Sequence, residues 1–474
     1  MNELDVFNRL NHHLPFEPTT GQQGFLYGIS DFISSKEMGR IYMLRGYAGT
    51  GKTSMVISLV ETLKELNRKY VLLAPTGRAA KVISQYTGQK AFTIHRMIYQ
   101  IRVDDSGRVH FGVRPNTSSN SVIVVDEASM IQGIATEIKL FGHGRGLLSD
   151  LMQFVEDGIN CKLILIGDTA QLPPVHMSVS PALDPKHLTA NFDFNNDQQF
   201  ELTEVVRQAE DSGILEIATY LRSLIKDEES LFQLDTGFPD VQSIDGYDVE
   251  ECLDDAYSKF GDEGVMVVTR SNKSANMFNQ QIRAKIKWQE EELDAGDKLM
   301  IVKNNYTWLP KDSKAGFIAN GEMAELLKVV RSEEKFGLRF ADVVIRLLDH
   351  AEESELEVKI ILDTLHSETT SLDEESAENL YNGVRMEHSR IPAKNERFKA
   401  IKEDQYLHAL QVKFGYAVTC HKAQGGQWPA VFIDQGYMTE EMLGPDHLRW
   451  LYTAVTRASE QLYLVNFAPQ FIKE

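Results

Sequence analysis

The chain lacks the features that mark several large classes of protein. It holds three cysteines in 474 residues, and no two of them form a Cys-x-x-Cys pair. This scarcity excludes a cysteine-ligated zinc module and a disulfide framework, and it fits a reducing cytoplasmic location. No apolar run approaches the roughly 18 residues of a membrane span, the N-terminal residues do not form a signal peptide, and no repeat of 20 to 50 residues is visible.

Positive charge is also scarce. The chain has 49 Lys and Arg against 69 Asp and Glu, which gives a formal net charge of −20. This balance argues weakly against a nucleic-acid partner, although a basic groove can exist on an acidic protein. The 42% hydrophobic and 25% charged content is that of a globular protein long enough for about two to four domains.

Against this background, residues 46–53 carry the strongest signal, the pattern Gly-x-x-x-x-Gly-Lys-Thr. A strand-like apolar run at 41–45 precedes it, and a helix-like run at 54–60 follows. A phosphate-binding loop needs this context, because its amides and the helix N-terminus must both face the phosphates. A glycine-rich turn without a ligand is the alternative, and it leaves the acidic motif downstream unexplained.

The chemistry of this loop assigns roles to its residues. Lys52 can reach the β- and γ-phosphates of a nucleotide, and Thr53 can hold Mg²⁺. The predicted nucleotide-binding residues of the loop are Gly46, Ala48, Gly49, Thr50, Gly51, Lys52 and Thr53.

An apolar run at 123–125 ends in Asp126 and Glu127. Such a pair is often structural, but with Lys52 upstream we expect Asp126 to hold Mg²⁺. Glu127 is then the group that orients and deprotonates the attacking water.

Three further polar residues fit the same chemistry. Gln171, in a loop stiffened by two prolines, can sense the γ-phosphate or its attacking water, although a tight turn is the simpler alternative. Arg207 and Arg457 can neutralise the charge of phosphoryl transfer from a second domain. Surface ion pairs are the alternative for these arginines, and their flanking sequences argue against it.

The pattern of apolar runs predicts the architecture. Four near-continuous runs are typical of parallel strands buried on both faces, at 41–45, 70–74, 121–126 and 162–167. Ligands of such a sheet bind at the carboxyl ends of the strands. Alternating runs at 99–103 and 108–113 predict a β-hairpin projecting from this domain, with a plain surface loop as the alternative.

The second half of the chain changes in texture. A strand at 265–268 continues the α/β pattern, and short strand-like runs then predict a small inserted β-barrel, at 298–302, 323–330, 343–348 and 356–362. Residues 351–380 hold ten acidic residues and one lysine, which is typical of a solvated connection. Residues 385–402 are basic and could contact a nucleic-acid backbone, although a solvated helix is the simpler interpretation.

Strand-like runs return at 410–413, 431–433 and 461–465, which predicts a discontinuous second α/β domain. We therefore expect a first domain at 1–200 with a hairpin at about 97–118, a second domain at 201–290 and 410–474, and the barrel with its connection at 291–409.

Hydroxyl, backbone, His and Arg groups at other strand ends are typical of contacts to a phosphate backbone, and the residues of these stretches are the predicted contacts. They are Pro75, Thr76, Arg78, Thr93, His95, Arg96, Thr419, His421 and Lys422. Gly425 lies in the same stretch as the last three, and we expect that stretch to face both the nucleotide and a polyanionic strand.

Taken in order, these motifs resemble the superfamily 1 helicases, and within them the RecD/Dda branch, superfamily 1B. The matching elements are TTGQQ, GYAGTGKT, APTGRAAK, TIHRM, VVDEASM, GDTAQLPPV, LTEVVRQ, VTRSNKSANMFNQQIR, YAVTCHKAQGGQ and YTAVTRA. The resemblance implies an AAA-type phosphate-loop core with a UvrD-like C-terminal domain. It also implies two RecA-like domains, a hairpin on the first and an SH3-like barrel in the second. It further assigns Gln22 to the nucleotide and Asn272 to the nucleic acid.

The activity implied by this resemblance is ATP-driven, Mg²⁺-dependent movement 5′→3′ on single-stranded DNA, with unwinding at a duplex fork. We expect a monomeric cytoplasmic enzyme of DNA repair, recombination or replication. Two alternatives stay open: a nucleotide-gated DNA-binding or remodelling ATPase that does not unwind, and an RNA helicase that contacts the 2′-OH.

Overall fold

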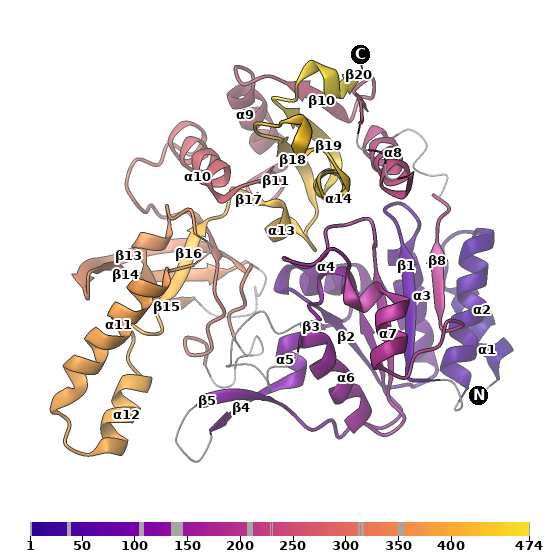
Figure 1. Ribbon diagram of the computed structural model, residues 1–474, viewed down its shortest axis with the longest axis horizontal. Coiled ribbons are helices and arrows are strands. Elements are labelled where there is room, and N and C mark those ends of the chain that lie inside the picture. Colours follow the sequence, from indigo (N-terminus) through magenta and orange to yellow (C-terminus); the bar gives the residue numbers. More distant parts are fainter. Residues whose placement is uncertain are drawn as a thin grey trace.

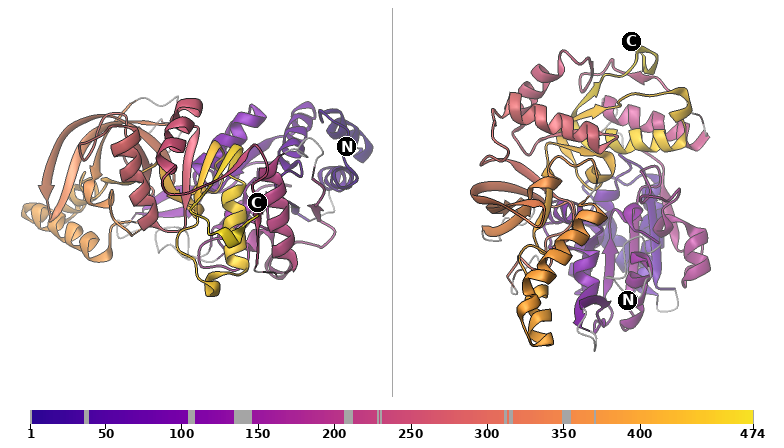
Figure 2. Two further views of the ribbon diagram at one scale, coloured as in Figure 1. Left: turned by 90° about the horizontal axis from the view of Figure 1, so that it is seen from above. Right: turned by 60° about the vertical axis from the view of Figure 1, so that its left-hand side comes forward.

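The computed structural model describes residues 2–35, 39–103, 109–133, 146–205, 212–227, 229, 231–310, 313, 317–348, 355–369 and 371–473. Two α/β domains and a β-barrel make up this part of the chain (Figure 1). The second α/β domain sits above the first, and the barrel lies beside both, as the further views show (Figure 2). This arrangement confirms the fold class predicted from the sequence.

The first domain is built on a six-stranded parallel sheet in the order β3-β2-β6-β7-β1-β8. The strands are β1 (Ile41–Gly46), β2 (Tyr70–Ala74), β3 (Ala91–Thr93), β6 (Val122–Val125), β7 (Lys162–Gly167) and β8 (Gln199–Leu202). The four predicted strands are confirmed as β1, β2, β6 and β7. Their carboxyl ends meet at one edge of the sheet, where a ligand of a parallel sheet binds.

Helices cover both faces of this sheet because successive strand residues point to opposite sides. On β1, Tyr42 and Leu44 join the core on one face, whereas Ile41 and Met43 join the core on the other. The helices of the domain are α1 (Glu3–His12), α2 (Thr20–Ser34), α3 (Lys52–Glu65), α4 (Gly77–Thr87), α5 (Ile94–Ile98), α6 (Leu147–Asp157) and α7 (Pro185–Asn191).

The predicted hairpin is confirmed as the antiparallel pair β4 (Tyr99–Val103) and β5 (Val109–Val113), with Tyr99 opposite Val113. It leaves the first domain at the lower edge of the view in Figure 1. Its base is fixed to the domain, since the Tyr99 hydroxyl donates to Asp150 Oδ2 at 2.6 Å. The turn at 104–108 lies outside the described residues.

The second domain draws its sheet from two separate stretches of chain. Its strand order is β10-β19-β18-β11-β17, from β10 (Val241–Ile244), β11 (Val265–Thr269), β17 (Ala417–Thr419), β18 (Trp428–Asp434) and β19 (Ala458–Val465). Its helices are α8 (Gly213–Asp227), α9 (Val249–Phe260), α10 (Asn272–Gln281), α13 (Cys420–Ala423) and α14 (Pro445–Val455). A short pair, β9 (Leu234–Asp235) and β20 (Ile472–Lys473), lies at its margin.

The barrel closes through five strands, and one of them corrects the sequence interpretation. They are β12 (Lys298–Ile301), β13 (Met323–Lys335), β14 (Leu338–Leu347), β15 (Leu356–Ile361) and β16 (Leu410–Phe414). The sequence placed β16 in the second α/β domain, but it pairs with β12 and β15. The error has a physical cause, because β16 and the nearby β17 are both short buried strands, and only their pairing assigns them to different sheets.

The strands β13 and β14 are also longer than expected. They join through a two-residue turn at Phe336 and Gly337, with φ of 55° and 76°. Two consecutive left-handed residues match the twist of a tight hairpin, and glycine at the second position adopts this conformation readily. Polar outward residues along both strands concealed this extension in the sequence.

Two helices, α11 (Glu374–Glu387) and α12 (Lys394–Lys402), extend from the barrel between β15 and β16. Leu380 and Val384 of α11 pack with Phe340 of β14 and with Tyr406, which precedes β16. The α12 helix has no buried residue, which fits the solvated-helix interpretation of 385–402. The remaining short helical turns are η1 (Ala128–Met130), η2 (Pro181–Leu183), η4 (Ile282–Ile286), η5 (Leu362–Thr364), η6 (His388–Arg390), η7 (Glu440–Met442) and η8 (Pro469–Phe471).

Across the described ranges, no helix combines the length and apolarity that crossing a membrane requires.

A buried cation links three strands of the barrel. The side chain of Lys359 on β15 is fully buried, and its Nζ lies 2.6 Å from Glu333 Oε1 and 2.6 Å from Asp342 Oδ1. The hydrogen bond from Lys359 is the main cause that lowers the pKa of Glu333. A single ammonium therefore compensates two carboxylates that face the barrel.

We predict that Lys359→Met lowers the free energy of unfolding by roughly 3 kcal/mol, because two partly buried carboxylates lose their cation. Urea titration measures this loss. Since Glu333 has a lowered pKa in the folded state, the wild-type advantage should be present near neutral pH and shrink as pH falls below 4.5, its ordinary value. The control Arg346→Met removes an exposed pair with Glu325 and should change stability little. Equal effects of the two substitutions would contradict the prediction.

Candidate nucleotide site and nucleic-acid channel

The phosphate loop connects β1 to α3, and its geometry follows from its glycines. Gly49 and Gly51 have φ of 75° and 86°, a region that only glycine enters without strain. Lys52 Nζ donates to the carbonyls of Gly46 at 2.7 Å and Tyr47 at 2.8 Å. An ammonium has three donors, so one N–H of Lys52 remains for a phosphate oxygen.

Gln22 on α2 is hydrogen-bonded to the phosphate loop. Its side chain is 1% exposed, and its amide oxygen accepts from the Thr19 N–H at 3.0 Å in a capping box. Its Nε2 donates to the carbonyl of Thr50 at 3.1 Å. The residue assigned to the nucleotide therefore contacts the loop itself and fixes the position of Thr50.

The two acids follow β6 as predicted. Glu127 has a left-handed backbone (φ 53°), and its N–H donates to Asp126 Oδ1 at 2.8 Å. The hydroxyl of Tyr86 on α4 donates to Asp126 Oδ2 at 2.7 Å, a contact that no sequence motif indicated. Burial raises the pKa of Glu127, while the charges of Arg457 and Lys52 oppose that rise. A carboxylate with a raised pKa is a suitable general base.

The residues present fit a magnesium ion. Thr53 offers a hydroxyl and Asp126 a carboxylate, and Mg²⁺ prefers such oxygen donors. When bound with a nucleotide, Mg²⁺ neutralises charge on the phosphates. Within the described residues, no group of three or more His, Cys, Asp or Glu side chains forms a separate metal site.

The loop after β7 is clamped between the two α/β domains. The Leu172 N–H donates to Thr453 Oγ1 at 2.8 Å, and its carbonyl accepts from Gln424 Nε2 at 2.8 Å. Arg449 also donates to the carbonyl of Thr169. Gln171 lies inside this clamp, 6% exposed, and its side-chain oxygen has no hydrogen-bond partner among the described residues. A buried unpaired oxygen at this position suits a water or ligand donor.

Arg457 approaches the first domain from the end of α14. Its side chain is 3% exposed, with Nε donating to the Thr453 carbonyl at 3.0 Å and one terminal nitrogen donating to the Gly426 carbonyl at 3.1 Å. Because its charge lowers the pKa of Glu127, the two groups interact across the interface. Arg207, the other predicted arginine, lies outside the described residues.

The structure places Gly425 against the first domain. It has φ of 75°, and a Cβ built on it would lie 2.8 Å from the Ala79 Cβ and 3.2 Å from Thr76 Oγ1. Gly425 therefore packs against the N-terminus of α4, and its predicted contact with the nucleotide stays a prediction. The sequence indicated a glycine-rich turn but not which part of the first domain that turn crosses.

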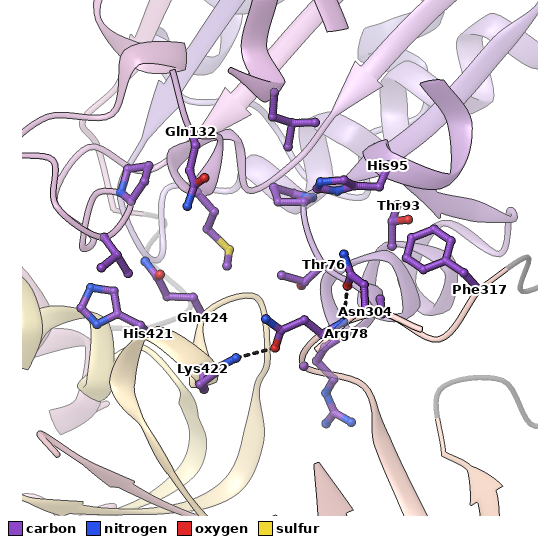
Figure 3. A pocket seen from close by; sticks show the side chains of 18 of the residues that line it. Thr76, Arg78, Thr93, His95, Gln132, Asn304, Phe317, His421, Lys422 and Gln424 are labelled. Carbon is purple, nitrogen blue, oxygen red and sulfur yellow. Dashed lines mark hydrogen bonds between the residues drawn. The ribbon is translucent and has the colours of Figure 1, made fainter. Parts of the chain in front are cut away.

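A cavity of about 290 Å³ lies where the two domains and the barrel meet (Figure 3). Residues from all three parts line it, among them Pro75, Thr76, Arg78, Thr93, His95, Gln132, Asn304, Phe317, Asn320, His421, Lys422 and Gln424. Burial lowers the pKa of His95 to about 4 and lowers that of His421. At neutral pH the positive charge of this channel therefore comes from Arg78 and Lys422.

The structure separates the remaining predicted contacts from this channel. Arg96 lines a neighbouring cavity of about 480 Å³ between α4 and the barrel. Asn272 donates to the Glu368 carbonyl at 3.0 Å, and Thr419 is the N-cap of α13. Neither Asn272 nor Thr419 lines the channel.

The barrel supplies channel residues that the sequence did not indicate. Asn320 accepts from Lys422 Nζ at 2.5 Å, and its N–H donates to Asn304 Oδ1 at 2.6 Å. Phe317 adds an aromatic ring to the same wall (Figure 3). Isolated asparagines and a phenylalanine in loops form no motif, so only the position of the barrel reveals them.

Comparison with known proteins finds two domain families that match this chain, one in its N-terminal half and one near its C-terminus. The AAA domain family matches residues 30–231, and the UvrD-like helicase C-terminal domain family matches residues 414–465. The ATP-dependent DNA helicase Dda of Enterobacteria phage T4 is 27% identical over 309 residues, 63% of this chain and 64% of that protein. The ATP-dependent RecD2 DNA helicase of Deinococcus radiodurans is 30% identical over 179 residues, 38% of this chain and 21% of that protein.

The chain spans less than two thirds of the length of these relatives. Among solved structures, a Pif1 helicase from Bacteroides in complex with ADP-AlF3 and ssDNA is 14% identical with a TM-score of 0.46, covering 94% of this chain and 93% of that chain. A Pif1 helicase from Candida albicans is 16% identical with a TM-score of 0.44, covering 92% and 93%. These structural similarities are too low to carry any feature over to this chain.

The sequence comparisons agree with the motif order and with the arrangement of the phosphate loop and acids. In the sequence, one family match precedes most of the barrel residues and the other follows them, and both fall mainly on the two α/β domains. The chain thus combines an AAA domain with a UvrD-like helicase C-terminal domain, and it is similar in sequence to the Dda and RecD2 DNA helicases.

Proposed function

We propose that the protein is an ATP-dependent DNA helicase that moves 5′→3′ on single-stranded DNA and unwinds a duplex fork. One observation carries this proposal: Gln424 belongs to both sites. Its Nε2 holds the loop of Gln171 through the Leu172 carbonyl, and its side chain also lines the channel. A change at the nucleotide site is thereby transmitted to the strand through a single side chain.

The residues of the interface divide the reaction between the two domains. Lys52 binds the phosphates, and Glu127 takes the proton of the attacking water. Arg457 neutralises charge that develops on the transferred group, and it does so only when the second domain is closed on the first. Hydrolysis thus depends on closure, and release of the products permits opening.

The channel supports a single strand better than a duplex. It combines Arg78 and Lys422 with the ring of Phe317 and the amide of Asn304, a mixture that suits phosphates and unstacked bases. We propose single-stranded DNA as its occupant, with ATP and Mg²⁺ at the interface. The three cysteines are free thiols, which supports a cytoplasmic location, and we expect a monomer.

Unwinding of paired duplexes tests the proposal. The wild-type protein with ATP should separate a duplex with a 5′ single-stranded tail and leave one with a 3′ tail intact. Lys52→Ala should abolish both unwinding and ATP turnover, because the phosphates lose their charged partner. Unwinding of the 3′-tailed duplex alone would reverse the polarity, and stimulation of ATPase by RNA but not by DNA would indicate an RNA helicase. DNA-stimulated ATPase without unwinding would indicate a remodelling protein.

Replacement of the predicted base separates binding from chemistry. Glu127→Gln should keep nucleotide affinity while single-turnover hydrolysis falls by roughly 10² to 10⁴. Equilibrium binding of a fluorescent ADP analogue and quenched-flow hydrolysis measure the two quantities. A collapse of affinity would instead make Glu127 a structural residue.

The hairpin should act in strand separation and not in the motor, because β4 and β5 leave the domain while the nucleotide-site residues lie elsewhere. Replacing residues 101–111 with a short Gly-Ser turn keeps the anchors Tyr99 and Val113. This variant should retain most DNA-stimulated ATPase and translocation but lose most duplex unwinding. Equal loss of translocation and unwinding would assign the hairpin to the fold or to strand binding.

A further inference from the structure

A tyrosine of the second domain reaches into the phosphate loop of the first. The hydroxyl of Tyr452 on α14 donates to Asp168 Oδ2 at 2.6 Å and accepts from the Ala48 N–H at 2.9 Å. Tyr452 and Asp168 are each 1% exposed. The phenol therefore joins the two domains at the loop that binds phosphates, inside a contact closed to water.

We infer that Tyr452 is a positioning residue for hydrolysis: its bridge from Ala48 and Asp168 to α14 places Arg457 opposite Glu127. This inference rests on the proposed function. It concerns a residue that touches neither the base nor the transferred group and acts only through the arginine.

In the first domain, the residue that accepts from Tyr452 lies beside the lysine of the phosphate loop. Asp168 Oδ2, which accepts from the phenol, lies 4.0 Å from Lys52 Nζ. Its Oδ1 accepts from the Ala170 N–H at 2.9 Å, which holds the carboxylate in place. Tyr452 is thus hydrogen-bonded to the loop on one side and to the partner of its lysine on the other.

In the second domain, the turn of α14 that holds Tyr452 also binds Arg457. Thr453, next to Tyr452, accepts from the Leu172 N–H through its hydroxyl, and its carbonyl accepts from Arg457 Nε. Two side-chain anchors therefore fix one turn of α14 to the first domain, and the guanidinium is bonded to that turn. A shift of this turn moves Arg457 relative to Glu127.

The phenol keeps its proton under all ordinary conditions. Burial raises the pKa of Tyr452 well above its usual value, and the charge of Asp168 adds to this rise. The hydroxyl therefore keeps its proton and can donate it to Asp168. The strength of the bridge depends on domain contact, since each partner of the hydroxyl belongs to the first domain.

Removing the hydroxyl isolates this role. Tyr452→Phe keeps the ring in its buried site but leaves the Ala48 N–H and one Asp168 oxygen without that partner. Turnover at saturating ATP and single-stranded DNA should fall about tenfold or more. The KM for ATP and the affinity for a fluorescent ADP analogue should change by less than about threefold, because Lys52 and the loop amides remain.

A double-mutant cycle tests whether the effect passes through the arginine. The kcat of Tyr452→Phe/Arg457→Ala should equal that of Arg457→Ala within about twofold, because a missing guanidinium cannot be misplaced. The control Tyr463→Phe removes another buried hydroxyl of the second domain, on a ring stacked against Phe432, and should leave kcat unchanged. Thermal melting of each variant confirms that it is folded.

The outcomes separate this inference from the proposed function. Wild-type kcat in Tyr452→Phe, or losses that multiply in the double variant, would overturn the inference while wild-type ATPase and unwinding stand. ATPase without unwinding in the wild type would overturn the helicase proposal and leave the inference intact, and no ATPase at all would overturn both. If Tyr452→Phe does not fold, Thr453→Val removes the adjacent anchor and should give the same lower kcat and the same equality with Arg457→Ala.

Discussion

The central constraint of this structure is the docking of α14 on the loop that follows β7. Arg449, Tyr452 and Thr453 contact Thr169, Asp168 and Leu172 through hydrogen bonds that cross the two α/β domains. These bonds lie in a buried interface, where a lost partner costs more than it would in water. Several directional bonds of this contact therefore end at the residues expected to carry the chemistry. Small changes at a nucleotide can alter such a contact without altering either domain.

The same docking connects the nucleotide site to the channel. The turn that holds Gln424 and Gly425 contacts Leu172 on one side and the N-terminus of α4 on the other. Gly425 allows this because a Cβ would collide with Ala79. The segment at Gln424 and Gly425 thus contacts both the nucleotide site and the channel. Relative movement of the domains therefore acts on both sites. The negative net charge of the chain is compatible with this arrangement, because Arg78 and Lys422 place positive charge inside the channel.

The barrel contributes to this arrangement by position. It lines the channel with Asn304, Phe317 and Asn320, and Lys422 of the second domain bonds to Asn320. We expect its own stability to depend partly on Lys359, which forms ion pairs with carboxylates of β13 and β14. The inserted barrel therefore forms one wall of the channel, and the ion pairs of Lys359 lie in a separate part of it.

The sequence by itself determined the phosphate loop, the acids at the end of β6, the hairpin and the parallel strands. Each of these depends on local chemistry: glycines at positive φ, carboxylates at a strand end, and the period of apolar residues. The tertiary structure alone decided which loops meet. It placed β16 in the barrel, Gly425 against α4, Gln22 behind the loop and Arg96 in a second cavity. It also brought Tyr452 to Ala48 and Asp168, residues about 280 to 400 positions earlier in the chain. The reason is physical, since a hydrogen bond between distant segments leaves no periodicity or spacing in the sequence, and only the packing of the domains brings its donor and acceptor together.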